Sequence, residues 1–183
     1  MLVLSGWERK ALDNLKNLDT NIFILDSSAF YAGFYRSFNC KFYTTTSILQ
    51  EIKHILKSSL TLDLLISSGA LIIQDPTKES VDKIMYTANL LGDIKKLSQA
   101  DISILSLAYQ LNRILVSDDY SVLNVSNFLK IKTISLGNEG IVALRKWKNF
   151  CKTCKKQYAP NIKECEICGN PTKRNYKKFR PPV

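Results

Sequence analysis

Histidine is nearly absent from this chain, which has one histidine among 183 residues. Histidine is the side chain that most often acts as a general acid or base near neutral pH. The single example, His54, falls on the solvent side of a predicted helix at residues 47–57, where a surface role explains it better than metal binding does. We therefore exclude histidine-based catalysis and look to other side chains for chemistry.

Long apolar runs are also missing. The first four residues, MLVL, are followed by polar ones, so the start lacks the run of about 7–15 apolar residues that marks a signal peptide. The most apolar window, residues 64–73, is interrupted by two serines and a glycine, and it is shorter than the about 20 residues of a transmembrane helix. These absences predict a cytoplasmic protein, in which thiols stay reduced.

Acidic residues are scarce in residues 145–183, which hold 12 lysines and arginines but only Glu164 and Glu166. Residues 1–144 carry 14 residues of each sign, so the net charge of +10 belongs to the C-terminal part. A basic segment beside a neutral domain is typical of proteins that bind polyanions, because lysines displace counterions from phosphates. The alternative is a solvated basic surface that only aids solubility.

Four of the five cysteines lie in this basic part, in a C-x2-C-x10-C-x2-C array of Cys151, Cys154, Cys165 and Cys168. Two C-x2-C pairs can place four thiolates around one Zn²⁺. Reduced thiols favour zinc over the alternative, a pair of structural disulfides. So short a module would depend on its metal to fold. The remaining cysteine, Cys40, is interpreted as an unpaired and buried residue.

The charge and cysteine patterns together divide the chain into four parts. We predict a domain at residues 1–144, a linker at 145–150, a zinc ribbon at 151–170 and a flexible basic tail at 171–183. Residues 141–147 are predicted to form a closing helix or part of the linker. The tail interleaves cations with aromatic residues, which suits RNA because its phosphates and unstacked bases offer partners to each.

Short apolar runs alternate with segments of helical period in residues 1–144. Buried strands are predicted at residues 22–25, 42–43, 71–73, 114–116 and 131–134. Helices are predicted at residues 6–17, 28–34, 47–57, 61–67, 79–91, 99–111 and 120–128. This alternation predicts an α/β fold with a central parallel sheet flanked by helices.

Acids stand directly after two of these strands. Asp26 follows the strand at residues 22–25, and Asp118 and Asp119 follow the strand at residues 114–116. Ligands of parallel sheets bind at the carboxyl ends of the strands, so these acids are candidates for chemistry. Helix capping is the alternative explanation for each acid taken singly, because Asp often begins a helix.

Two further acids lie on predicted helices. Glu51 borders the buried face of its helix, about 100° from the centre of the apolar stripe. Asp101 lies within roughly 40° of the centre of its own stripe, so its charge points toward the core and needs a partner. Capping by Ser98 is the local explanation for Asp101, and metal coordination is the functional one.

These acids are predicted to gather at one edge of the sheet. Clustered carboxylates repel one another, and a divalent cation offsets that repulsion. Mg²⁺ and Mn²⁺ prefer oxygen ligands, and such a cation can lower the pKa of a bound water for attack on a phosphodiester. The sequence therefore predicts a metal-dependent hydrolase that acts on nucleic acid.

Four segments together resemble a PIN domain, a nuclease fold with a set of metal-binding acids. They are LDSS at residues 25–28, the helix that carries Glu51, the helix start at Ala100-Asp101, and SDDY at residues 117–120. With NV at residues 124–125 and a four-cysteine ribbon after the domain, the chain more narrowly resembles the Nob family of PIN endonucleases, which mature small-subunit ribosomal RNA.

This resemblance implies an Mn²⁺- or Mg²⁺-dependent endoribonuclease that cleaves precursor 16S-type rRNA at its mature 3′ end within a pre-30S particle. A KH-domain assembly factor is a candidate partner. By match to the motif, the metal ligands would be Asp26, Glu51, Asp101 and Asp119, with Asp118 as an adjacent candidate. PIN proteins usually carry Thr/Ser-x-Asp here, which favours Asp119. The loop near residues 38–43 and the tail lysines would hold RNA.

Two alternatives remain at this stage. A toxin-type PIN ribonuclease acting on tRNA or mRNA would share the acids, but such toxins are usually compact domains without a ribbon. A noncatalytic assembly factor would bind rRNA through its zinc ribbon, and its acids would lie apart or pair with lysines.

Overall fold

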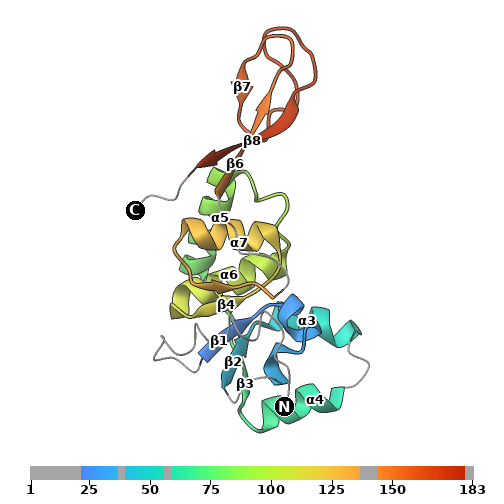
Figure 1. Cartoon of the computed structure of the whole chain (residues 1–183), viewed down its shortest axis with the longest axis vertical. Helices are drawn as coiled ribbons and strands as arrows, with labels where there is room; N and C mark the ends of the chain where they lie inside the picture. Colours follow the sequence, from blue (N-terminus) through green and yellow to red (C-terminus); the bar gives the residue numbers. More distant parts are fainter. Residues whose placement is uncertain (1–21, 37–39, 56–58, 137–143, 180–183) are drawn as a thin grey trace, which may run out of the picture.

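The computed structural model describes residues 22–36, 40–55, 59–136 and 144–179. These residues form a five-stranded parallel sheet in the order β3-β2-β1-β4-β5 and a three-stranded antiparallel sheet in the order β7-β6-β8. Helices flank the parallel sheet, and the smaller sheet projects from one end of the long axis (Figure 1). The predicted α/β fold is confirmed.

The elements of the larger part agree closely with the predicted ones. Its strands are β1 (Ile22–Leu25), β2 (Lys41–Thr44), β3 (Leu71–Ile73), β4 (Ile114–Val116) and β5 (Thr133–Ile134). Its helices are α2 (Ser27–Tyr31), the 3-10 helix η1 (Phe34–Arg36), α3 (Thr46–Ile55), α4 (Ser59–Ser67), α5 (Lys78–Leu91), α6 (Gln99–Leu111) and α7 (Tyr120–Phe128). Every one of these helices falls short of the length and apolarity that crossing a membrane requires.

Some predicted boundaries were wrong. The predicted helix at residues 28–34 is interrupted, because Gly33 adopts a positive φ of 71° between α2 and η1. Residues 41–44, assigned in part to an RNA-binding loop, form β2 inside the sheet. The predicted helix at residues 6–17 and the start of that loop at residues 37–39 lie outside the described residues.

The chain order of the strands creates a crevice between β1 and β4. From β1 the chain proceeds outward through β2 to β3, and then returns to β4 on the other side of β1. Ligands of open α/β sheets bind at such a reversal, beyond the carboxyl ends of the two strands. Leu25 pairs with Val116, and the Asp26 N–H donates to the Val116 carbonyl at 3.1 Å. The acids that follow β1 and β4 are therefore neighbours.

The core surrounds β1 and β4, whose residues are buried on both faces of the sheet apart from the half-buried Ile22. This explains why both strands read as continuous apolar runs rather than as alternating patterns. Phe23, Phe34 and Phe42 pack together, with ring centroids 5.5 Å apart between Phe23 and Phe34. The rigid centre of the sheet thus supports the edge at which the acids lie.

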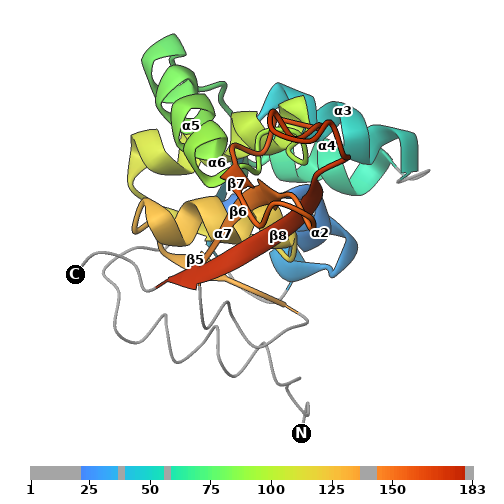
Figure 2. The ribbon, with the colours of Figure 1, turned by 90° about the horizontal axis from the view of Figure 1, so that it is seen from above.

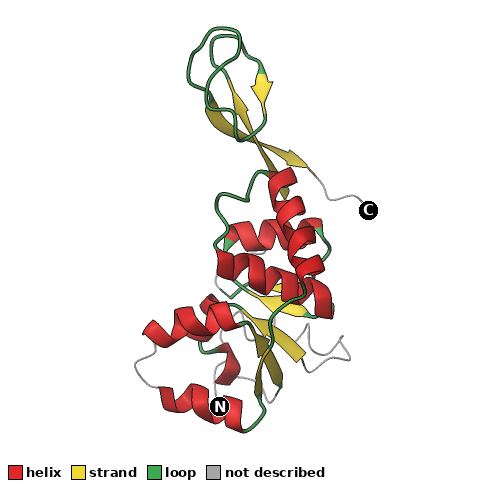
Figure 3. Cartoon of the chain, turned by 180° about the vertical axis from the view of Figure 1, so that it is seen from behind, coloured by secondary structure: helices red, strands yellow, loops and turns green. Residues whose placement is uncertain are grey.

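The smaller sheet overturns the predicted linker and tail. It contains β6 (Leu144–Phe150), β7 (Gln157–Tyr158) and β8 (Lys173–Phe179), and β6 pairs with β8 from Leu144↔Phe179 to Phe150↔Lys173. The closing helix or linker predicted at residues 141–147 and the linker predicted at residues 145–150 are replaced by β6 over their described residues, and residues 173–179 of the flexible tail predicted at 171–183 form β8. Pairing with a distant segment, which the local pattern does not show, satisfies much of the backbone hydrogen bonding of each strand. Figure 3 shows that this part contains strands and loops only.

Candidate active site and cysteine cluster

Asp26 both caps a helix and lies in the crevice. It is 2% exposed and is the N-cap of α2, where its Oδ1 accepts a hydrogen bond from the Ser27 N–H at 2.7 Å. Its Oδ2 accepts from the hydroxyls of Ser117 at 2.6 Å and Ser28 at 3.3 Å. Burial raises the pKa of Asp26, the hydrogen bond from Ser117 lowers it, and the charge of Asp101 raises it further.

Asp119 begins the helix that follows β4. Its Oδ1 accepts from the backbone N–H groups of Ser121 at 2.7 Å and Val122 at 2.9 Å, so it is the N-cap of α7. The Asp119 N–H donates to the Ser117 hydroxyl at 3.2 Å. Ser117 therefore connects Asp119 to Asp26 through its single hydroxyl oxygen.

Asp118 has a different environment. Its Oδ1 accepts from the Ser135 hydroxyl at 2.8 Å and from the Leu136 N–H at 2.7 Å. Its own N–H donates to the Ser28 hydroxyl at 3.1 Å. These bonds tie the end of β4 to the segment after β5, which is a structural role for Asp118. Ser28, which contacts both Asp26 and Asp118, was missed by sequence reasoning because a Ser-Ser pair at a helix start suggests capping alone.

Asp101 lies in the first turn of α6 and forms the capping box with Ser98. Its Oδ2 accepts from the Ser98 N–H at 2.8 Å, and its own N–H donates to the Ser98 hydroxyl at 3.1 Å. Asp101 therefore takes part in helix capping with Ser98, as the local explanation for this acid predicted. Burial raises the pKa of Asp101, the hydrogen bonds from Ser98 lower it, and the charge of Asp119 raises it.

Glu51 is the remaining candidate acid, and it is an exposed residue of α3. Burial raises its pKa first, and the charges of Asp101 and Asp26 raise it further. Asp26, Glu51, Asp101 and Asp119 thus act on one another electrostatically, and we call them the acid group. Oxygen donors of this kind suit Mg²⁺ or Mn²⁺, although among the described residues the four cysteines alone converge as a set of possible metal ligands. Their role as metal ligands stays a prediction.

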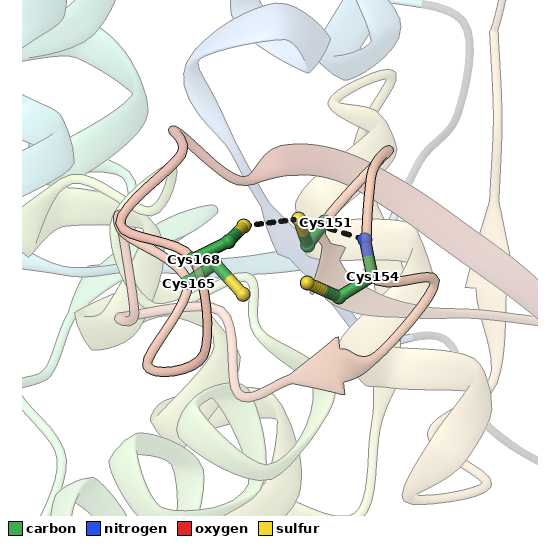
Figure 4. Close-up of side chains that lie close together, drawn as sticks. All are labelled: Cys151, Cys154, Cys165 and Cys168. Atoms are coloured by element: carbon green, nitrogen blue, oxygen red, sulfur yellow. Dashed lines mark hydrogen bonds between the residues drawn. The ribbon is translucent and has the colours of Figure 1, made fainter.

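The cysteines do converge. In the described residues, one sulfur atom from each of Cys151, Cys154, Cys165 and Cys168 lies within 4.8 Å of the other three. Figure 4 shows the pair from one C-x2-C turn facing the pair from the other, with Cys151 Sγ and Cys168 Sγ 3.6 Å apart. The Tyr158 hydroxyl lies 3.0 Å from Cys165 Sγ, and its hydrogen bond, with those from the backbone of Cys168 and Ile167, lowers the pKa of Cys165 to about 6. Four sulfur donors in this arrangement could hold Zn²⁺.

One side of the β6–β8 pair is strongly basic. Residues that oppose each other in an antiparallel pair share a side, so Lys146 lies with Lys177, and Phe150 lies with Lys173. A pocket of about 230 Å³ opens here, lined by Lys148, Phe150, Lys155, Gln157, Asn175, Tyr176 and Lys177. We call Lys146, Lys148, Lys173 and Lys177 the basic face. Lysines beside aromatic rings suit the phosphates and bases of RNA.

Comparison with known proteins finds relatives that are named as ribonucleases. A family model described as the PIN domain of ribonuclease matches residues 23–111. Endoribonuclease Nob1 of Pyrococcus abyssi is 36% identical over 152 residues, which cover 82% of this chain and 91% of that protein. Ribonuclease VapC1 of Thermoplasma acidophilum is 30% identical over 162 residues, covering 88% of this chain and 82% of that protein.

A eukaryotic relative matches a shorter stretch. The 20S-pre-rRNA D-site endonuclease NOB1 of Saccharomyces cerevisiae is 34% identical over 103 residues. That match covers 56% of this chain and 21% of the yeast protein. The Pyrococcus abyssi protein is thus described as an endoribonuclease, and the yeast protein as a pre-rRNA endonuclease.

Proposed function

This chain belongs to the Nob family of PIN-domain endoribonucleases, and on that basis we propose that it cleaves precursor 16S-type rRNA at its mature 3′ end. The observation that carries the proposal is the acid group at the β1–β4 crevice, in a chain that also bears a basic ribbon. The name of the yeast relative, which describes a pre-rRNA endonuclease, supports the substrate class.

We assign the acids as the ligands of Mn²⁺ or Mg²⁺. Asp26, Glu51, Asp101 and Asp119 would hold the cation, which when bound supplies a water of lowered pKa as the nucleophile. Ser117 would orient Asp26 through its 2.6 Å hydrogen bond. Because the pKa values of three of these acids are raised, protons compete with the cation for them as the pH falls.

The ribbon would bind the substrate. The four cysteines would hold Zn²⁺, and the basic face would contact rRNA phosphates in a pre-30S particle. A cytoplasmic location would keep the thiols reduced for zinc, and a KH-domain assembly factor is a candidate partner in presenting the rRNA. We include in this proposal the division of the chain into a nuclease domain and a zinc ribbon.

Two other functions remain as competitors. A toxin-type PIN ribonuclease that cuts tRNA or mRNA is the first, and the similarity to ribonuclease VapC1 supports ribonuclease activity without naming the RNA. The noncatalytic alternative requires acids that lie apart or pair with lysines. Within the described residues, however, none of the acid group forms a salt bridge with a lysine or arginine. The lack of such ion pairs supports a catalytic role, whereas the spacing of the acids leaves the noncatalytic function open, because among the described residues only the cysteines form a converging group.

The test uses zinc-loaded protein and an RNA that spans the small-subunit 3′ boundary, with Mn²⁺ or with EDTA. We expect one metal-dependent cut at the boundary. Asp26→Asn and Asp119→Asn should each leave RNA binding unchanged and lower the cleavage rate. The loss in rate should exceed the roughly 10–100-fold that is typical when a residue that only orients a metal ligand is replaced. The matched neighbour Asp118→Asn retains an oxygen acceptor for Ser135 and should still cut.

The result that would overturn the proposal is cleavage that survives both ligand substitutions or EDTA. Preferential cleavage of tRNA or mRNA, without a cut at the rRNA boundary, would establish the toxin-type function instead. If the protein binds the rRNA and cuts none of these RNAs with its assembly partner present, the noncatalytic function holds.

A further inference from the structure

A buried carboxylate outside the acid group lies between the ribbon and the α/β part. Asp93 is 0% exposed and directly follows Gly92, the C-cap of α5. Its Oδ2 accepts from Asn124 Nδ2 at 2.6 Å, and its Oδ1 lies 3.8 Å from Arg174 Nη2 of β8. Burial raises the pKa of Asp93, whereas Asn124 and Arg174 lower it. Sequence reasoning missed Asp93 because Gly-Asp after a helix reads as an ordinary turn.

Asn124 binds β6 as a neighbouring strand would. Its Nδ2 donates to the Arg145 carbonyl at 3.0 Å, and its Oδ1 accepts from the Arg145 N–H at 2.9 Å. Both backbone groups of Arg145 are therefore held by one side chain of α7. From β8, Arg174 Nη2 donates to the Gly92 carbonyl at 2.9 Å. Each long strand of the ribbon is thus bonded to the α/β part.

The end of α5 also packs closely against the ribbon. Gly92 has a φ of 77°, and a Cβ atom there would lie 2.6 Å from Pro160 Cγ and 3.0 Å from Trp147 Cβ. Real Cβ atoms essentially never come within 3.0 Å of another heavy atom, so the 2.6 Å approach to Pro160 would force a shift. Pro160 belongs to the spacer between the two cysteine pairs, so the metal-binding module itself touches the α/β part.

Stacked cations and rings fill the rest of the contact. The Arg145 guanidinium carbon lies 4.4 Å from the centroid of the Tyr120 ring and 4.7 Å from that of Tyr176. The Trp147 ring lies 4.2 Å from the Arg174 guanidinium carbon and 4.4 Å from Lys96 Nζ. The contacts of Arg145 with Tyr120 and of Lys96 with Trp147 cross between the two parts, and the other two lie within the ribbon. The crossing contacts favour one relative orientation of the two parts.

These contacts meet on the helix that carries an acid of the candidate site. Tyr120 and Asn124 lie one turn apart on α7, and Asp119 is the N-cap of that helix. Seen along the long axis, β6 crosses over α7, and the two elements are in contact (Figure 2). Helix α7 therefore connects the ribbon to Asp119 of the acid group.

We propose that this junction is a positioning device that fixes the basic face relative to the acid group and so sets where bound RNA is cut. The junction comprises Gly92, Asp93, Tyr120 and Asn124 on one side and Arg145, Trp147, Pro160 and Arg174 on the other. The consequence for cleavage rests on the proposed function, whereas the fixed orientation does not. A buried polar network whose hydrogen bonds cross from one part to the other favours one arrangement of the parts it joins. Among the described residues, Asp93 Oδ1, Tyr120 Oη and Trp147 Nε1 form no hydrogen bond within it.

The test compares two substitutions that each remove one cation from β8 of the zinc-loaded full chain. Arg174→Ala acts in the junction, and Lys177→Ala acts on the basic face. Backbone ¹⁵N relaxation should give one rotational correlation time for both parts of the unsubstituted protein and of Lys177→Ala. In Arg174→Ala the ribbon should tumble faster than the α/β part. Arg145→Ala, which removes the stacking but not the backbone bonds, provides a second variant if Arg174→Ala folds poorly.

The cleavage pattern gives the functional readout. Junction variants should spread the products over neighbouring nucleotides and lose the single dominant cut, whereas Lys177→Ala should weaken RNA binding and keep the cut position. Separate tumbling of the two parts in the unsubstituted protein, or unaltered tumbling and cut position in both junction variants, overturns the proposal. If the unsubstituted protein cuts no RNA, the proposed function fails, and the relaxation data still decide whether the junction is rigid.

Discussion

At the scale of single residues, Ser117 controls two acids with one hydroxyl. It donates to Asp26 Oδ2 at 2.6 Å and accepts from the Asp119 N–H at 3.2 Å, and its side chain is fully buried. A buried hydroxyl with both partners fixed can adopt a single orientation, so it holds Asp26 in place. The motif favoured Asp119 over Asp118, and that choice stays a prediction, because the carboxylates of both accept structural hydrogen bonds.

Removing this hydroxyl should shift the pH dependence of cleavage. The hydrogen bond from Ser117 lowers the pKa of Asp26, so Ser117→Ala raises that pKa further above its ordinary value. Asp26 then gains its proton at a higher pH, and the acidic limb of the pH–rate profile moves upward. We expect cleavage near pH 7 to fall by about 10-fold.

Single-turnover cleavage measured across pH tests this expectation. Ser117→Thr retains the hydroxyl and serves as the control, with a profile near that of the unsubstituted protein. An identical profile for Ser117→Ala would show that the hydroxyl does not act on the reaction.

At the scale of elements, three helix starts deliver three of the acids. Asp26 caps α2, Asp101 lies in the first turn of α6, and Asp119 caps α7. The N-terminus of a helix carries a partial positive charge and unpaired N–H groups, both of which favour a carboxylate. Capping and function are therefore not exclusive alternatives at these positions, since the same carboxylate can do both.

The ribbon is an element whose fold should depend on its metal. Its buried cluster is limited to Cys151, Tyr158 and Cys165, which is separate from the large core of the α/β part. So small a core cannot offset the entropy of ordering the chain without further links. Chelation of zinc should therefore unfold residues 151–170 and leave the α/β part folded.

Zinc content and ¹H–¹⁵N spectra recorded before and after chelation check this prediction. Cys165→Ser should lose the metal, whereas Cys40→Ser should retain it because Cys40 lies outside the cluster. Ribbon resonances that keep their dispersion after chelation would contradict it.

At the scale of the whole molecule, the two charged regions occupy different parts of an elongated shape. The acid group lies at the sheet, and the basic face lies on the projecting ribbon (Figure 1). The two opposite charges are thereby kept apart, so the acids, which repel phosphate, do not lie beside the lysines that attract it. Affinity for RNA and cleavage of RNA should consequently respond to different substitutions.

The salt dependence of RNA binding should report the basic face. Each of Lys146→Ala, Lys148→Ala and Lys177→Ala should reduce the slope of log K against log salt concentration by about 0.7–0.9 when the lysine contacts a phosphate. Fluorescence anisotropy at several salt concentrations measures the slope. Lys78→Ala, an exposed lysine at the start of α5, should leave it unchanged. Equal effects at all four positions would mean that binding is not localised on the ribbon.

The sequence by itself determined the elements of the α/β part and the identity of the cysteine cluster. Buried strands such as β1 and β4 are short apolar runs bounded by polar residues, and the spacing of two C-x2-C pairs is local. Such features depend on neighbours within a few positions, so they can be read from the chain directly.

Only the tertiary structure decided which distant segments meet. The pairing of β6 with β8 joins segments separated by the whole metal-binding module, and neither shows a strand pattern strong enough to predict it. Asp93 became a junction residue because Asn124 and Arg174 come from elements far along the chain. Long-range contacts are set by packing and buried polar pairing rather than by local propensity, and for that reason the orientation of the ribbon on the nuclease fold emerged only in three dimensions.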